Sequence, residues 1–455
     1  MAKHSIPELI KLLTEQGATK IKLAVTDIDG VLRGKVISFE KFRSCVEKGF
    51  GFCDVVFGWD AADAAYDNVQ YTGWHTGYPD AIAVIDHTTF RRIPWENDLP
   101  FFLADFHNGD DKHLAVCPRS LLKKISQQAT TAGYQVFASQ EFEWFNLIDN
   151  RSELYAGKFR DLKPMTPGMF GYSILRASQQ SGFFNDLFDL LTKFEIPIEG
   201  LHTETGPGVY EAAIMYSDIV EAADRAVLFK TSVKQIGHKH GILPTFMAKF
   251  SETLPGCSGH VHQSLWSRDG KENLFYDKKS KSGISGLMES YIAGQLHCLP
   301  HILPMFAPTV NSYKRLVEGA WAPTTITWGI DNRTTALRAL PVSSTAARLE
   351  TRVVGSDANP YLAMAGCLAA GLYGIRNKMK LNIAPTTGNG YLDTTNGMLP
   401  KGLWPATQAM KESSLAIELF GEAFVHHFTA TREWEWRQFS KVVTDWELKR
   451  YLEII

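Results

Sequence analysis

Residues 134–148 read YQVFASQEFEWFNLI, a run of aromatic, β-branched and alternating polar residues that predicts a β-strand. Successive side chains of a strand point to opposite faces, so Glu141 and Glu143 share one face while Phe142 and Trp144 take the other. A solvated strand face would account for such a pair about as well as a function would. Neighbouring like charges are unfavourable without a partner, however, and a bound cation removes that penalty. The strand therefore predicts a sheet with an acidic site on one face.

Strand-like and helical segments alternate over the rest of the chain. Helices are predicted near residues 218–238, 283–299 and 359–377, and the last opens with Asn359-Pro360, a capping residue followed by proline. The further strands are predicted at IEGLHTET (198–205), GVYEAAIMY (208–216), TFMAKFS (245–251), GHVHQSLW (259–266), TTITWG (324–329), TALRAL (335–340) and ARLETRVV (347–354). This pattern predicts an α+β fold, in which helices pack against a mostly antiparallel sheet.

The N-terminal region predicts a smaller, β-rich domain. A short helix with apolar residues in helical spacing comes first, and IKLAVTDIDGVLRGKVISF (21–39) then places Asp29-Gly30 between two apolar runs, which is a hairpin signal. The polar segment DFHNGDDKHLAVC (105–117) ends this region, and Pro118 opens a helix that we expect to continue to about Ala132. We therefore expect one domain over residues 1–112 and a second over residues 113–455.

Composition excludes several classes of protein. A chain of 455 residues exceeds what one hydrophobic core usually serves, which agrees with two domains. The formal net charge is −2 and the basic residues are scattered, so we expect no nucleic-acid partner. No apolar run approaches the roughly 20 residues of a membrane span, no targeting signal is recognisable, and the six cysteines are widely spaced. We expect a cytoplasmic protein with reduced cysteines.

Two further segments add acidic and imidazole groups. Glu204 ends one predicted strand and Glu211 lies on the next, with a Gly-Pro-Gly connection that brings them near each other. In GHVHQSLW, His260, His262 and Ser264 alternate onto one face. A lone histidine is usually structural, but two in register with a serine indicate contact with a metal ion or a phosphate.

A carboxylate flanked by two guanidinium groups is predicted near the end of the sheet. Arg348, Glu350 and Arg352 line one face of ARLETRV, and a salt-bridged strand is the simplest alternative explanation.

Three more arginines follow one another in the segment NSYKRLVEGAWAPTTITWGIDNRTTALRAL. They are Arg315, Arg333 and Arg338, and arginine forks suit bidentate binding of carboxylates and phosphates. A two-cation phosphoryl-transfer site needs oxygen ligands for Mg²⁺ or Mn²⁺ and several arginines for the transferred group. The segments above supply both.

The order of these motifs resembles the glutamine synthetase family over nearly the whole chain. The motifs are E-x-E, E-x-x-x-G-x-x-E, G-H-x-H-Q-S-L, N-S-Y-K-R-L, D-N-R-x-x-x-x-R and R-x-E-x-R followed by A-N-P-Y-L. The resemblance implies an N-terminal β-grasp domain and a large catalytic domain. It also implies a homo-oligomer, usually a dodecamer of two stacked hexamers, in which each active site lies between two subunits.

The resemblance further implies roles for individual residues. One cation would be held by Glu143, Glu204 and Glu211, and a second by Glu141, His260 and Glu350. Two arginines, Arg315 and Arg352, would hold the acid substrate beside Gly256. The charge moving from ATP would be stabilised by Arg333, Arg338 and Arg348, with His262 and Ser264 at nucleotide-contacting positions. The implied cofactors are two or three Mg²⁺ or Mn²⁺ ions per site, with ATP as co-substrate.

The implied reaction transfers the γ-phosphoryl group of ATP to a side-chain carboxylate, and an unprotonated amine then attacks the acyl phosphate. Members that use ammonia carry a glutamate two residues after the glycine of the loop R-L-x-P-G-x-E-A-P, and Trp321 stands in that place here. Indole in place of a charge disfavours NH₄⁺ and favours an apolar substituent. We therefore expect a ligase that joins the γ-carboxylate of L-glutamate to an aryl or alkyl primary amine, such as aniline or isopropylamine, in amine catabolism.

Two other departures concern the same end of the site. The D-G-S-S segment that deprotonates ammonium in the family is replaced by DVVFGWDAAD (54–63), where Asp60 is a candidate base and Phe57 and Trp59 are candidate pocket residues. Which aspartate serves as the base is left open. Pro255 replaces the asparagine that contacts the backbone of the glutamate substrate in the family. Fewer residues of this chain therefore match the family's glutamate site, although L-glutamate remains the expected acid.

Three alternatives stay open at this point. Glutamine synthetase proper would use ammonia as the nucleophile. A non-catalytic relative would keep the fold for a structural or binding role. A metal-dependent phosphatase or kinase would turn over ATP without an amine.

Overall fold

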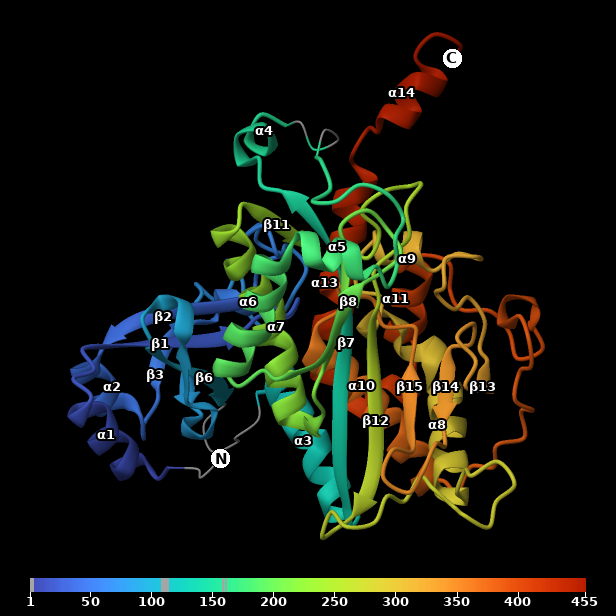
Figure 1. Ribbon diagram of the computed structural model, residues 1–455, viewed down its shortest axis with the longest axis horizontal. Helices are drawn as coiled ribbons and strands as arrows, with labels where there is room; N and C mark the ends of the chain where they lie inside the picture. The colour runs from blue at the N-terminus through green and yellow to red at the C-terminus, as the bar shows by residue number, and fades with distance from the viewer. Residues whose placement is uncertain (1–3, 108–113, 158, 160–161) are drawn as a thin grey trace.

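The computed structural model describes residues 4–107, 114–157, 159 and 162–455. Its strands form two sheets, a six-stranded one near the N-terminus and a nine-stranded one in the rest of the chain (Figure 1). The predicted boundary between residues 112 and 113 lies outside the described residues, so the division into two domains at that point stays a proposal.

The six-stranded sheet contains the predicted hairpin. Its strand order is β2-β1-β6-β4-β3, with β5 paired to β6, and only the β1–β6 pairing is parallel. The hairpin turn between β1 and β2 places Gly30 at φ +82°, a conformation that favours glycine. The strands are β1 (Lys20–Thr26), β2 (Leu32–Ser38), β3 (Phe50–Cys53), β4 (Asp80–Ile85), β5 (Arg91–Ile93) and β6 (Leu99–His107).

The nine-stranded sheet has β7 (Tyr134–Ile148) near its centre. The order is β13-β14-β15-β12-β7-β9-β8, with β10 and β11 also paired to β7, and only β13 and β14 run parallel. The predicted α+β class and the mostly antiparallel sheet are confirmed. The other strands are β8 (Ile198–Thr203), β9 (Val209–Ile214), β10 (Ser217–Asp218), β11 (Ile242–Thr245), β12 (Gly259–Ser267), β13 (Trp328–Ile330), β14 (Leu337–Leu340) and β15 (Arg348–Thr351).

Long helices cover one face of the nine-stranded sheet and leave the other face for side chains of the site. Helices α3 (Pro118–Thr131) and α7 (Ile219–Lys239) pack on β7, and α10 (Pro360–Arg376) packs on both of them and on α8 (Gly286–Ile302). Helices α1 (Ile6–Glu15) and α2 (Phe39–Cys45) lie beside the first sheet (Figure 1). The predicted cap of α10 is confirmed, because the Asn359 side chain accepts a hydrogen bond from the Tyr361 amide and Pro360 follows it. The remaining helices of the described residues are α4 (Arg151–Tyr155), α5 (Ile174–Gln179), α6 (Ser181–Lys193), α9 (Ser312–Arg315), α11 (Leu403–Lys411), α12 (Ser414–Phe420), α13 (Glu422–Ser440) and α14 (Asp445–Tyr451). Short 3₁₀ turns lie at Asp54–Phe57, His87–Thr89, Pro94–Glu96, Leu303–Met305 and Gly390–Leu392.

A buried ion-pair network joins the two halves of the molecule. The Arg119 guanidinium of α3 donates to Asp105 of β6 at 2.7 Å and to Asp224 of α7 at 2.8 Å, and all three residues are buried. Breaking such a pair by removing one partner leaves an uncompensated buried charge, so the network fixes how the first sheet meets the helices of the second.

The predicted strand at 245–251 is wrong beyond its first residue. Strand β11 ends at Thr245, and the Lys249 amide donates to the Asn311 side chain at 2.8 Å instead of joining a ladder. The apolar ring of Phe246, which suggested a strand, packs in the core of the larger sheet. Within the described ranges, no helix is long and apolar enough to cross a membrane.

Candidate functional site

Strand β7 places its two glutamates as its sequence pattern predicts. Phe142 and Trp144 are fully buried against the helices, while Glu141 and Glu143 lie on the other face of the sheet. Glu141 pairs in register with His260 of β12, and Glu143 with Glu211 of β9. Antiparallel pairing therefore brings three predicted acidic and imidazole segments to one place.

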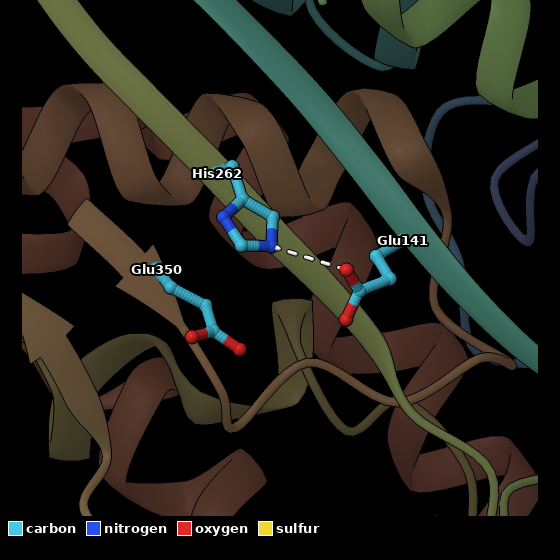
Figure 2. A group of neighbouring side chains, drawn as sticks. All are labelled: Glu141, His262 and Glu350. Carbon is cyan, nitrogen blue, oxygen red and sulfur yellow. Dashed lines mark ion pairs between the residues drawn. The ribbon is translucent and has the colours of Figure 1, made fainter. Parts of the chain in front are cut away.

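The first group of candidate ligands lies between β7, β12 and β15. Three side chains each bring one possible ligand atom to within 4.8 Å of the other two, namely Glu141, His262 and Glu350. Figure 2 shows the three side chains directed toward a common space. His260 adjoins this group, with its Nδ1 3.2 Å from a Glu350 oxygen and 3.5 Å from a Glu141 oxygen. His262, which we assigned to the nucleotide, thus also lies at the predicted metal position.

The second group contains a residue that the sequence analysis missed. Ligand atoms of Glu204, Glu211 and His202 lie within 4.8 Å of one another, and the His202 Nε2 is 3.4 Å from each carboxylate. His202 lies on β8, two residues before Glu204. The alternation of side chains that predicted Glu141 and Glu143 on one face therefore also predicts His202 on the face of Glu204. The ring of Tyr172 stacks on His202 with 4.5 Å between centroids, and no sequence pattern indicated this contact.

The electrostatics of these groups fit divalent cations. Burial and the neighbouring carboxylates raise the pKa of Glu141 and of Glu211 above the ordinary value. Burial, followed by the charge of Arg352, lowers the pKa of His260, so its imidazole is neutral and able to coordinate. The Nε2 atoms of His202 and His260 are buried, and no group in the described part of the chain is hydrogen-bonded to them. Carboxylate oxygens with neutral imidazoles are suitable ligands for Mg²⁺ or Mn²⁺.

These pKa shifts predict how the stability of the metal-free protein depends on pH. The unfolded chain releases the Glu211 proton near pH 4.5, whereas the folded protein retains it to higher pH. The folded state therefore binds more protons above that value, so its stability falls as pH rises. We expect the melting temperature of metal-free protein to fall between about pH 6 and about pH 8, and added Mg²⁺ or Mn²⁺ to raise it more at the higher pH.

The Glu211→Gln variant is the control for this pH dependence. Glutamine keeps the shape of the side chain but carries no titrating proton, so the decline with pH should be shallower than in the wild type. Equal slopes of melting temperature against pH in the two metal-free proteins would contradict the assignment.

A fully buried carboxylate organises two of the predicted arginines. The Arg338 guanidinium donates to Glu350 Oε2 at 2.9 Å, and Arg352 donates to Glu350 Oε1. Burial alone would raise the pKa of Glu350, but His262, Arg352 and Arg338 hold it below its ordinary value. Glu350 therefore stays ionised between the first ligand group and the guanidiniums.

The other predicted arginines take three different positions. Arg315 is buried and donates to the carbonyl oxygens of Val353 and Arg352 at 3.0 and 3.1 Å, which fixes its guanidinium. Arg348 donates to His262 Nδ1 at 3.3 Å. Arg333 is exposed, and its carbonyl oxygen accepts a hydrogen bond from Arg352.

One pocket gathers the residues that we assigned to the acid substrate. A Cβ atom on Gly256 would stand 2.7 Å from the Arg315 Cγ atom, so this glycine admits the arginine to the pocket wall. Trp321 lies at the pocket with 62% of its surface exposed and with φ at +56°. The pocket is lined by Glu143, Glu204, Thr205, Pro255, Gly256, Ser258, Arg315, Ala320, Trp321 and Arg352.

A second pocket gathers the residues that we assigned to the nucleotide. It contains Glu141, His262, Ser264 and Arg348. Aromatic rings that the sequence analysis did not assign complete its wall, and Phe137 makes edge contacts with Tyr216 and Trp266 at 5.8 and 5.7 Å. Glu141 lines this pocket and Glu143 lines the acid pocket, so the carboxylate face of β7 connects the two.

The candidate residues of the N-terminal region lie elsewhere. Phe57 is fully buried in the core of the first sheet, and the Trp59 ring lies 5.0 Å from the Arg33 guanidinium. Asp60 accepts hydrogen bonds from the amides of Ala62 and Ala64 and from the Trp434 indole. None of these three candidates lines the acid pocket or the nucleotide pocket. Asp60 lines a different pocket, together with Arg432 and Trp434.

Comparison with known proteins shows which family the chain resembles in sequence and in structure. Residues 115–451 match the family described as "Glutamine synthetase, catalytic domain". A solved structure described as "Apo GmaS without ligand" aligns with a TM-score of 0.85 at 25% identity, over 98% of this chain and all of the other.

Two relatives indicate how broad that family is. "Type-1 glutamine synthetase 2" of Dictyostelium discoideum is 52% identical over 96% of this chain and 84% of its own length. "Glutamate--isopropylamine ligase" of a Pseudomonas species is 35% identical over 100% of this chain and 99% of its own length.

Proposed function

Because this chain belongs to the glutamine synthetase family and is therefore an ATP-dependent carboxylate–amine ligase, we propose that it joins the γ-carboxylate of L-glutamate to a primary amine. The amine would carry an aryl or alkyl group, such as aniline or isopropylamine, and the reaction would pass through γ-glutamyl phosphate. One observation supports an aryl or alkyl amine as the substrate: the indole of Trp321 lies at the pocket that Glu204 and Arg315 also line.

The chain's own residues would perform three tasks. Arg315 and Arg352 would bind the carboxylate of the acid, because guanidinium groups match carboxylates in a bidentate geometry. Arg338, Arg348 and the exposed Arg333 would stabilise the charge of the phosphoryl group during transfer. The nucleotide would lie in the pocket of His262 and Ser264, with the rings of Phe137 and Trp266 beside it.

The two ligand groups would hold divalent cations, which the family uses together with ATP. Glu141, His260 and Glu350, with His262 beside them, would hold a cation at the nucleotide end. Glu143, Glu204 and Glu211, with His202, would hold another at the acid end, and a third in the same cluster is compatible with this number of carboxylates. Bound Mg²⁺ or Mn²⁺ would neutralise phosphate charge and orient the oxygens of the substrates.

Ammonia is the second candidate nucleophile. It is favoured by the identity of 52% to a protein described as a glutamine synthetase, against 35% to one described as an isopropylamine ligase. The opposing observation is chemical, since an indole offers no charge that would attract NH₄⁺ to the acid pocket.

A single assay separates these candidates. ADP release is measured with ATP, Mg²⁺ or Mn²⁺ and L-glutamate, while ammonia, isopropylamine, ethylamine and aniline are supplied one at a time. We expect an organic amine to give the highest kcat/KM. Fastest turnover with ammonia alone would assign the second candidate, and ADP release that needs no amine would contradict ligation.

We also propose that the chain works as a homo-oligomer, a dodecamer of two stacked hexamers, with sites that combine residues of two subunits. Asp60 and Trp59 would then reach the acid pocket of a neighbour, whereas Phe57, with its ring in the core, is left out of this proposal. The C-terminal helix α14 projects from the body of the chain (Figure 1). Trp446 of this helix and Leu452 directly after it are exposed, which supports a second copy as the partner of this segment. Light scattering of the native protein would measure the assembly directly.

A further inference from the structure

Ser258 is held rigidly at the wall of the acid pocket. Its amide donates to Glu143 Oε2 at 2.7 Å, and its carbonyl oxygen accepts from the Glu143 amide at 2.9 Å. The residue also forms an isolated bridge with Gly355 and is only 3% exposed. Main-chain bonds therefore fix the position of Ser258, and its hydroxyl has no part in them.

The hydroxyl of Ser258 has no hydrogen-bond partner among the described residues. Its Oγ atom is buried there without a hydrogen bond, although buried polar groups are nearly always paired. The neighbouring Ser356 gives a direct comparison, because its hydroxyl donates to the Glu143 carbonyl oxygen at 2.7 Å. Packing a hydroxyl without a partner costs free energy that an alanine at the same place would avoid, which points to a ligand.

Ser258 is also the one source of a free polar side-chain group on its segment of the pocket wall. Pro255 has no amide hydrogen and Gly256 has no side chain. The Cys257 side chain is turned into an apolar cluster with Phe145. A serine hydroxyl both donates and accepts, and it changes direction by a single χ1 rotation.

We propose that the Ser258 hydroxyl accepts a hydrogen bond from the α-ammonium group of the acid substrate. This inference rests on the proposed function. The pocket's arginines would bind the carboxylates of the substrate, and Glu143 and Glu204 would bind the cation. The Thr205 hydroxyl already donates to Glu204 at 2.9 Å, so the Ser258 hydroxyl is left as the side-chain acceptor for the α-ammonium group. Ser258 would thus select α-amino acids in a segment of the pocket wall where Pro255 offers no polar side chain.

The test is a comparison of two acids in two variants. Glutarate differs from glutamate by the absence of the α-amino group. In Ser258→Ala we expect the KM for glutamate to rise about tenfold with little change in kcat, because a hydrogen bond to a charged group is lost. The inhibition constant of glutarate against glutamate should stay within about twofold.

A matched serine separates binding from folding. Ser356→Ala removes a satisfied hydroxyl, so we expect its melting temperature to fall, whereas Ser258→Ala should melt at the wild-type temperature or above. An equal rise in the KM of glutamate and in the inhibition constant of glutarate would overturn the proposal. A lower melting temperature for Ser258→Ala without a change in the KM of glutamate would also overturn it. A rise only in the Mg²⁺ or Mn²⁺ concentration that gives half-maximal rate would assign the hydroxyl to the cation instead and also overturn it. Wild-type protein that shows no glutamate-dependent turnover would contradict the proposed function and not this assignment.

Discussion

Replacing Glu350 by glutamine should reduce turnover by at least about a hundredfold and also destabilise the folded protein. Glu350 is fully buried, and it lies between Arg338, Arg352 and the imidazole of His260. A neutral amide would remove a cation ligand and would leave the guanidiniums without their shared counter-charge. Removing one partner of a buried ion pair costs about 3–5 kcal/mol of unfolding free energy. Steady-state ADP release and thermal unfolding of metal-free protein measure the two effects.

The matched variant is Glu143→Gln, in which stability should change in the opposite direction. Glu143 lies beside Glu141 and Glu211, and its charge contributes to the raised pKa of both. Its amide isostere would relieve that repulsion in the metal-free protein while still removing a carboxylate from the acid-end group. We therefore expect turnover to fall in both variants, with a lower melting temperature for Glu350→Gln and an unchanged or higher one for Glu143→Gln. Wild-type turnover in Glu350→Gln would show that the site is wrongly placed.

The sheet could be predicted from the sequence because its signal is local. In YQVFASQEFEWFNLI, the alternation that buries Phe142 and Trp144 also fixes the direction of Glu141 and Glu143. Each motif on a neighbouring strand then needed only antiparallel pairing to reach the same face. The helix caps and the Asp29-Gly30 hairpin were equally local.

Features that depend on tertiary contacts could not be predicted in the same way. The segment after Thr245 has the composition of a strand. The Lys249 amide, however, donates a hydrogen bond to the side chain of Asn311, which is far away in the sequence. Tyr172 reaches His202 from an irregular loop with φ at +56°, and nothing in its local sequence marks this contact. His202 was predictable in principle, since it shares the strand face of Glu204. The proposed contribution of Asp60 and Trp59 would depend on a second subunit, and the sequence of one chain does not position that subunit.

Replacing Trp321 by glutamate should shift the preference of the enzyme toward ammonia, and by a large factor. A carboxylate at this position would attract NH₄⁺ and would remove the apolar surface that binds an alkyl or aryl group. We expect the ratio of kcat/KM for ammonia to that for isopropylamine to rise by about tenfold to a hundredfold. Because the position is 62% exposed, the glutamate would stay ionised, and the gain should shrink at high ionic strength.

The backbone at Trp321 makes this substitution interpretable and supplies its control. At φ +56° the residue occupies the left-handed region, which is unfavourable for tryptophan and for glutamate alike, so the exchange adds little new strain. Asparagine tolerates that conformation better, and Trp321→Asn removes the ring without adding a charge. The asparagine variant should weaken the use of bulky amines and leave the use of ammonia unchanged, whereas only the glutamate variant should improve the use of ammonia. If neither variant alters the ratio of ammonia to amine turnover, then the indole does not contact the nucleophile, and the amine is selected by other residues, for which Trp59 of a neighbouring subunit is the proposed candidate.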